Sequence, residues 1–330
     1  ISVYPDKTPM EEVYAYMEKA AKLGYSRIFT CFLSIPDEER ETYLVEFKNF
    51  MTKAHELGFE VAADTNPGVF KLIGATPGNL KPFADLGLDI IRMDGNFGTR
   101  GDIQLTRTPY NIMIEFNASM DPGVELLINQ GGNKDQMIMC HNFFPERYTG
   151  LDWNLFQDLN AYWKSLNLKT AAFVSSRNDN TIGPWQVFCG LPTVEIMRNL
   201  PIDLQARYYL ATGDVDDILI GNYPATDEEL EALASINFQA MEIKIDEVEG
   251  ITENEKKYAM FKQEAMTLAA ISNKNVVKVY ENGIYENNPY LVMEYVKGRS
   301  LKDIIYGPKN FGFDEEEAIH LQFVDISGNV

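Results

Sequence analysis

The sequence predicts an α/β protein: a TIM (β/α)8 barrel over residues 1–236, followed by a small α+β segment over residues 237–330. Short apolar segments alternate with helical stretches eight times in the first part, which matches the size and repeat number of a TIM barrel. Polar residues follow nearly every apolar segment, as expected where parallel strands end at a common face. A doubly wound open sheet is the main alternative, but no GxGxxG follows the first apolar segment.

The predicted strands are short apolar segments separated by helical stretches. In chain order they are residues 1–5, 27–32, 60–67, 89–95, 113–119, 137–145, 169–176 and 217–222. The stretches between them carry helix signals. Residues 6–22 have apolar side chains at helical spacing and end at Gly24, and residues 38–57 end at Gly58. Glycine favours such ends because it readily adopts the left-handed conformation that closes a helix.

Composition limits the class of partner. The 330 residues include 29 Lys plus Arg against 49 Asp plus Glu, a formal net charge of -20. Such a surface repels nucleic acid and anionic lipid, so neither is expected as a partner, and an anionic substrate requires a local cluster of cations and N–H groups. No apolar run is long enough to span a bilayer, and the N-terminus does not resemble a secretion signal, so we expect a cytoplasmic protein.

The cysteines do not form a recognisable metal or disulfide motif. Cys31, Cys140 and Cys189 are odd in number and lack CxxC spacing. We therefore expect reduced thiols, and we expect neither a metal nor another cofactor.

Three carboxylates interrupt apolar strands near their carboxyl ends, where TIM barrels carry their chemistry. Asp64 ends the third predicted strand, Asp94 ends the fourth, and Glu115 lies inside the fifth. Period-two alternation puts Arg92 on the face of Asp94, and Asn117 on the face of Glu115. Paired carboxylates are typical of glycoside hydrolysis. The structural alternative is that Arg92 or a loop arginine neutralises Asp94 and that Asp64 caps a turn.

Polar groups after the sixth and seventh predicted strands are candidate substrate contacts. His141 is expected to form hydrogen bonds rather than bind metal, because no second ligand stands at metal-binding spacing. Hydroxyls and a guanidinium after the seventh strand suit a phosphate or a sugar, since TIM barrels often bind phosphate at their last two loops. The alternative is a polar surface loop. Together with Asn117 of the fifth predicted strand, the candidate contacts are His141, Asn142, Arg147, Ser175, Ser176 and Arg177.

Several long motifs over residues 1–236 resemble one family. RIFTCFLS, CHNFFPERYTGL, NTIGPW, RNLPIDLQA and ATGDVDDILIGN occur in the order seen in the MupG-type 6-phospho-N-acetylmuramidases. The resemblance implies a cytoplasmic bacterial glycosidase of cell-wall recycling, which splits a disaccharide of 6-phospho-N-acetylmuramic acid and N-acetylglucosamine. It also implies a TIM barrel followed by a cyclophilin-like domain. By position, the matching motifs support a site that contains the three carboxylates together with Asn117, His141 and Asn142. They do not assign the nucleophile.

After residue 236 the sequence instead resembles part of the amino-terminal lobe of a bacterial Ser/Thr protein kinase. AMEIK, ending at Lys244, is similar to the strand with the ATP-contacting lysine, and FKQEA is similar to the helix whose glutamate, here Glu264, pairs with it. Residues 273–305 resemble the following strands, the hinge and the next helix. A glycine-rich loop and an Asp-Phe-Gly motif are absent, so we expect ATP-site remnants without kinase activity.

Two hypotheses remain. The first is a glycosidase acting on a phosphorylated amino-sugar disaccharide. The second is an inactive chimera, or a nucleotide-binding or regulatory protein, in which the barrel is a scaffold. The kinase-like segment, whether natural, artefactual or engineered, has apolar strands whose exposed edge would favour self-association.

Overall fold

The structure is a computed structural model that describes residues 1–33, 40–237, 279–285 and 288–293. The chain divides into two compact units, 1–240 and 241–330. The candidate residues Lys244 and Glu264 lie outside the described residues. The domain assignment at residue 236 and the kinase-like interpretation of the second unit therefore stay predictions.

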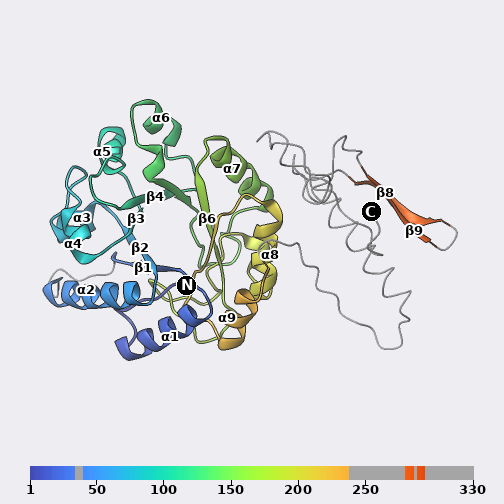
Figure 1. Cartoon of the computed structure of the whole chain (residues 1–330), viewed down its shortest axis with the longest axis horizontal. Coiled ribbons are helices and arrows are strands. Elements are labelled where there is room, and N and C mark those ends of the chain that lie inside the picture. Colours follow the sequence, from blue (N-terminus) through green and yellow to red (C-terminus); the bar gives the residue numbers. More distant parts are fainter. Residues whose placement is uncertain (34–39, 238–278, 286–287, 294–330) are drawn as a thin grey trace, which may run out of the picture. The chain divides into compact units, whose positions relative to one another are not determined.

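The first unit is a ring of parallel strands surrounded by helices (Figure 1). Seven strands pair in sequential order, each parallel to the next, and their interiors are almost entirely buried. They are β1 (Arg27–Cys31), β2 (Glu60–Thr65), β3 (Ile90–Met93), β4 (Met113–Asn117), β5 (Met137–Cys140), β6 (Lys169–Val174) and β7 (Asp217–Ile220). This arrangement confirms the predicted α/β barrel.

The prediction that residues 1–5 form a full strand is wrong. Among the described residues, the strand-like pairing of this segment is limited to a single parallel bridge between Ser2 and Phe29 of β1. It still joins β1 to the far end of the ring, because the Ser2 hydroxyl donates to the Ile220 carbonyl at 2.5 Å and the Tyr4 hydroxyl donates to the Gly221 carbonyl at 2.7 Å. Side-chain bonds thus complete the circle on the side of β7, where the sequence pattern predicts backbone pairing.

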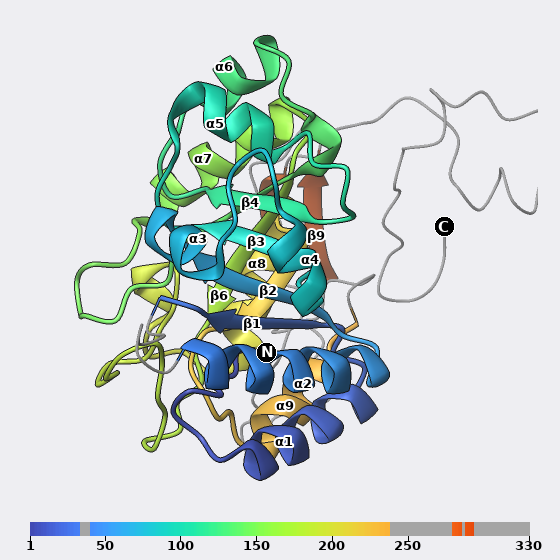
Figure 2. The ribbon, with the colours of Figure 1, turned by 90° about the vertical axis from the view of Figure 1, so that its left-hand side faces the viewer.

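Helices precede, separate and follow the strands of the ring and cover it from outside (Figures 1 and 2). They are α1 (Met10–Lys22), α2 (Arg40–Glu56), α3 (Pro67–Ile73), α4 (Lys81–Leu86), α5 (Gly98–Leu105), α6 (Val124–Asn129), α7 (Trp153–Ser165), α8 (Ile202–Thr212) and α9 (Asp227–Ala234). The first helix begins at Met10 rather than at residue 6, because Pro9 occupies its N-cap. Gly24 and Gly58 have positive φ angles just beyond α1 and α2, as predicted.

Aromatic side chains fill part of the barrel interior. Phe29 of β1 and Phe173 of β6 meet edge to face with ring centroids 5.3 Å apart, and Phe143, after β5, packs on both. Such pairs add to the free energy gained by burying the rings. They support the segment that follows β5, which carries several candidate residues.

In the second unit, the described residues form one antiparallel pair, β8 (Val279–Tyr285) with β9 (Asn288–Met293). These segments overlap the apolar runs expected to form strands.

In the described part of the chain, no helix combines the length and apolarity needed to cross a bilayer.

Candidate active site

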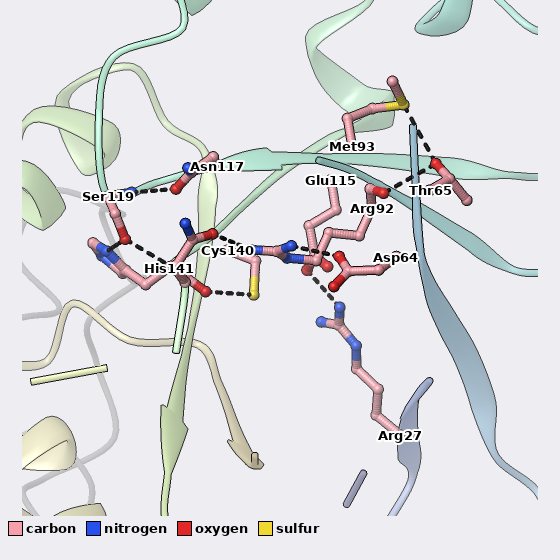
Figure 3. A network of polar contacts seen from close by, with 11 residues as sticks. Arg27, Asp64, Thr65, Arg92, Met93, Glu115, Asn117, Ser119, Cys140 and His141 are labelled. Atoms are coloured by element: carbon pink, nitrogen blue, oxygen red, sulfur yellow. Dashed lines mark hydrogen bonds and ion pairs between the residues drawn. The ribbon is translucent and has the colours of Figure 1, made fainter. Parts of the chain in front are cut away.

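A buried ion pair lies at the carboxyl ends of β2 and β3. Asp64 and Arg92 are register partners, and the Arg92 guanidinium donates through Nη1 to Oδ1 of Asp64 at 2.5 Å (Figure 3). Both residues are 4% exposed. Since register partners in parallel strands share a face, Asp64 and Arg92 both point into the barrel. Arg92 therefore pairs with Asp64. The structural alternative, in which Arg92 neutralises Asp94, is wrong on this point.

The environment of Asp64 favours its neutral form. Burial raises the pKa of Asp64 from 3.8 to about 6, the Arg92 guanidinium opposes this shift, and the charges of Asp94 and Glu115 add to it. Burial prevails because a carboxylate loses its hydration in the barrel, and a single cation does not replace that hydration completely. A carboxyl whose pKa lies near neutrality can donate a proton as well as accept one.

Glu115 occupies the same level of the barrel but faces a different cation. It is a register partner of Arg92 and is fully buried. Its Oε1 accepts from Nη2 of Arg27 at 2.5 Å, while its Oε2 is buried without a hydrogen-bond partner among the described residues. Arg27 also donates to Asp217 at 2.7 Å. Arg27 and Asp217 begin β1 and β7, so this ion-pair network reaches toward the amino ends of the strands.

Asp94 differs from the other two carboxylates because it is exposed. It follows the last residue of β3, and its backbone N–H donates to the Thr65 carbonyl at 2.7 Å. The charge of Asp94 acts on the titration of Asp64, so the two carboxylates are electrostatic neighbours. An exposed carboxylate beside a buried carboxyl is the asymmetry expected of a base or nucleophile beside an acid.

A hydrogen-bonded cluster adjoins Arg92. Asn142, directly after the buried His141, accepts from Nη2 of Arg92 at 2.5 Å, and its own N–H donates to the Ser119 hydroxyl. His141 contacts Ser119 through Nδ1 and Asn160 through Nε2, both at 3.3 Å. Burial lowers the pKa of His141 to about 3, so its imidazole is neutral. His141 therefore supports Ser119 and, through it, the amide that faces Arg92.

Asn117 joins this cluster through its side chain. It ends β4 half-buried, and its Oδ1 accepts from the Ser119 N–H at 2.8 Å. The structure thus brings the candidate residues Asp64, Asn117, His141 and Asn142 together around Arg92.

The candidate phosphate contacts after β6 are arranged differently from expectation. Ser175 and Ser176 are buried, and the Ser176 hydroxyl donates to Oε2 of Glu229 at 2.5 Å. The Arg177 N–H donates to Oε1 of the same carboxylate at 2.7 Å, and the Thr226 N–H donates to Oε2 at 3.0 Å. The Glu229 carboxylate from α9 therefore already uses the hydroxyl and N–H groups that an anion would use. The Arg177 side chain is exposed.

The loop after β5 carries the second candidate cation. Arg147 is exposed, next to Tyr148, whose φ of 66° lies in the left-handed region. The loop is held by Glu195, which accepts from the N–H groups of Tyr148 and Gly150, both at 2.9 Å. The Arg198 ion pair and these bonds lower the pKa of Glu195 to about 2.

Sequence reasoning missed four groups: Arg27, Glu195, Glu229 and the pair Ser119–Asn160. The sequence does contain a signal for Arg27. It lies two positions before Phe29 in an apolar strand, so period-two alternation places both side chains on the same face of the sheet. The others sit in helices or loops and face their partners only after folding. Within the part of the chain that the structure describes, no group of three or more histidine, cysteine, aspartate or glutamate side chains could hold a metal ion.

Fold and site define a class: a TIM-barrel protein with carboxylates and a guanidinium at the carboxyl ends of its early strands. Residues 1–235 match the family model MupG_N, described as 6-phospho-N-acetylmuramidase, N-terminal. The chain belongs to this family.

Two solved structures are similar to the barrel. One is an uncharacterised B. cereus protein, with 39% identity and a TM-score of 0.69 over 78% of this chain and 70% of the other. The second is a conserved Enterococcus faecalis protein of unknown function, with 26% identity and a TM-score of 0.61 over 69% of this chain and 62% of the other.

The curated relatives match a shorter part of the chain. A probable serine/threonine-protein kinase of Clostridium perfringens is 46% identical over 68 residues, which is 21% of this chain and 10% of the kinase. A serine/threonine-protein kinase of Mycobacterium leprae is 42% identical over 53 residues, or 15% of this chain and 8% of the kinase. The chain thus spans about a tenth of the length of the curated relatives it matches.

Proposed function

We propose that this protein is a cytoplasmic glycoside hydrolase of cell-wall recycling, which cleaves a disaccharide of 6-phospho-N-acetylmuramic acid and N-acetylglucosamine. The observation that carries the proposal is the state of Asp64: a buried carboxyl with a pKa of about 6, in a chain of the 6-phospho-N-acetylmuramidase family. Glycoside hydrolysis requires a proton donor for the leaving oxygen, and a carboxyl of raised pKa supplies it.

In the proposed reaction, Asp64 is the general acid. It transfers its proton to the glycosidic oxygen as the bond to the anomeric carbon breaks. The Arg92 guanidinium, 2.5 Å from Oδ1, stabilises the carboxylate that remains. Asn142 accepts from the other end of the same guanidinium and so limits its rotation. Asn117 and His141 support this arrangement through Ser119.

Asp94 is the second carboxylate of the proposed pair. It is exposed after β3, so water and substrate can reach it. As a base it would take a proton from the attacking water, and as a nucleophile it would bond to the anomeric carbon. Glu115 is assigned a supporting part, because its charge raises the pKa of Asp64 and its carboxylate is held by Arg27 inside the barrel.

The 6-phosphate requires a local cation in a chain of net charge -20. We assign this part to the exposed guanidinium of Arg177, with Arg147 on the loop after β5 as the second candidate. Ser175 and Ser176 then shape the loop rather than bind the dianion, since Glu229 accepts the hydrogen bond of the Ser176 hydroxyl.

Hydrolysis of a chromogenic glycoside of 6-phospho-N-acetylmuramic acid tests the proposal. Wild-type turnover is expected, with a loss of two or more orders of magnitude in Asp94→Asn. Asp64→Asn should lose as much on a substrate with a poor leaving group. Asp85→Asn, which makes the same chemical change at an exposed ion pair on α4, is the control and should keep full activity. Absence of turnover in the wild type, or full activity in both site variants, would refute the assignment.

The kinase matches favour a second candidate, a nucleotide-binding or regulatory protein. Binding of ATP that disappears in Lys244→Met, together with no glycosidase turnover, would support this candidate instead.

A further inference from the structure

Trp185 presents an unusual aromatic surface on the loop that follows β6. Its side chain is 46% exposed, although an indole ring normally gains free energy from burial. Its one ring contact in the described part of the chain is with Phe143, at a centroid distance of 6.0 Å and an interplanar angle of 51°. One part of the ring is thus supported while the remainder faces solvent.

The support beneath Trp185 is rigid. Phe143 packs edge to face on Phe29 and Phe173, with centroids 5.8 and 5.0 Å away, and both of those rings belong to barrel strands. The backbone that leads into Trp185 is also held. The Lys7 ammonium donates to the Pro184 carbonyl, and Ile182 forms a bridge with Tyr223. These contacts restrict the indole on the side of Phe143, so it loses less conformational entropy on binding a ligand than an unsupported side chain would.

This surface is connected to the buried carboxyl through consecutive residues. Phe143 follows Asn142 in the chain, and Asn142 accepts from Arg92, which in turn pairs with Asp64. The aromatic platform and the proposed acid are thus linked through one short segment after β5. A ligand on the indole would lie on the face of the barrel where the strands end.

We propose that Trp185 is a stacking platform for the neutral N-acetylglucosamine ring of the disaccharide. The inference rests on the proposed function and adds a specificity-determining residue to it. The C–H face of a pyranose is apolar while its hydroxyls stay hydrated, so an exposed, supported aromatic ring suits it. The uncharged indole fits the sugar without phosphate, whereas the dianion of the other sugar requires a guanidinium such as that of Arg177.

Two measurements on the full chain test this platform. The first is a fluorescence titration with N-acetylglucosamine alone, compared between the wild type and Trp185→Phe. The other two tryptophans, Trp153 and Trp163, remain in the variant, so a change in emission that disappears there comes from Trp185. The expected result is a saturable change in the wild type and none in Trp185→Phe. No saturable change in the wild type, or the same change in the variant, would overturn the inference.

The second measurement is steady-state hydrolysis of the disaccharide. Trp185→Ala is expected to raise KM by roughly fivefold to tenfold, the loss of one aromatic contact, with a smaller change for an aryl glycoside that lacks N-acetylglucosamine. Trp185→Phe should recover most of the affinity. Phe188→Ala on the same loop, where the side chain is 78% exposed, is the matched control and should keep the wild-type KM. Equal KM values for wild type and Trp185→Ala would overturn the inference.

The two experiments separate this inference from the proposed function. Fluorescence binding by Trp185 without wild-type hydrolysis supports the platform and refutes the glycosidase assignment. Hydrolysis that is insensitive to Trp185→Ala, with no fluorescence change, supports the glycosidase and refutes the platform.

Discussion

Replacing Asp64 by asparagine tests the buried carboxyl through stability as well as activity. The pKa of Asp64 in the folded protein is about 6, against an ordinary value of 3.8. Between these values the folded chain keeps the proton while the unfolded chain releases it. The folded state then binds more protons than the unfolded state, so its stability falls as the pH rises. Below this window both states are protonated, and above it both are ionised.

The magnitude follows from the shift. About 1.4 kcal/mol for each pH unit over roughly two units amounts to about 3 kcal/mol. Arg92 contributes with the opposite sign, because its attraction to the carboxylate favours the ionised folded form. The net direction depends on burial outweighing that attraction, which makes the sign of the pH dependence a direct test.

The assay is urea unfolding of the full chain between about pH 4 and pH 8, in the wild type and in Asp64→Asn. Subtracting the two free energies of unfolding removes every group that titrates equally in both proteins. Relative to the variant, the wild type should lose about 3 kcal/mol from roughly pH 4 to pH 6 and then change little. A difference that is flat, or that rises with pH, would refute the raised pKa.

Three further predictions concern other parts of the chain. Glu115→Gln should destabilise the barrel by about 2–3 kcal/mol in urea unfolding, because the buried Arg27 then keeps only the partly exposed Asp217 as a charged partner, and unchanged stability would contradict the importance of the Arg27–Glu115 pair. Arg177→Ala should raise KM roughly tenfold or more for a 6-phosphorylated substrate and far less for its unphosphorylated analogue, whereas an equal rise would reject this phosphate contact. The full chain should transfer no phosphate from labelled ATP and magnesium to a generic acceptor protein, because Lys244 and Glu264 alone cannot position the nucleotide. Transfer that disappears in Lys244→Met would contradict this last expectation.

Several candidate residues could be predicted from the sequence, because the carboxyl end of a strand can be recognised from the local apolar pattern alone. Asp64 and Asn142 each stand where an apolar segment ends, and parallel strands bring their ends to one face. At residues 1–5 the prediction of a full strand was wrong. The apolar pattern there is that of a strand, but the segment forms one backbone bridge to β1 and reaches β7 through the Ser2 and Tyr4 hydroxyls.

The sequence by itself determined the barrel, because apolar periodicity and helix-ending glycines are local properties that folding only has to preserve. Tertiary structure decided which charges meet. Alternation places Arg92 on the face of Asp94 and Glu115 on the face of Asn117, but it does not show that Arg92 pairs with Asp64, or that Glu115 pairs with Arg27, 88 positions away. It likewise does not show that Glu229 accepts from the Ser176 hydroxyl. These partners are set by strand register and by closure of the ring, which fix distances between segments that no short stretch of sequence contains.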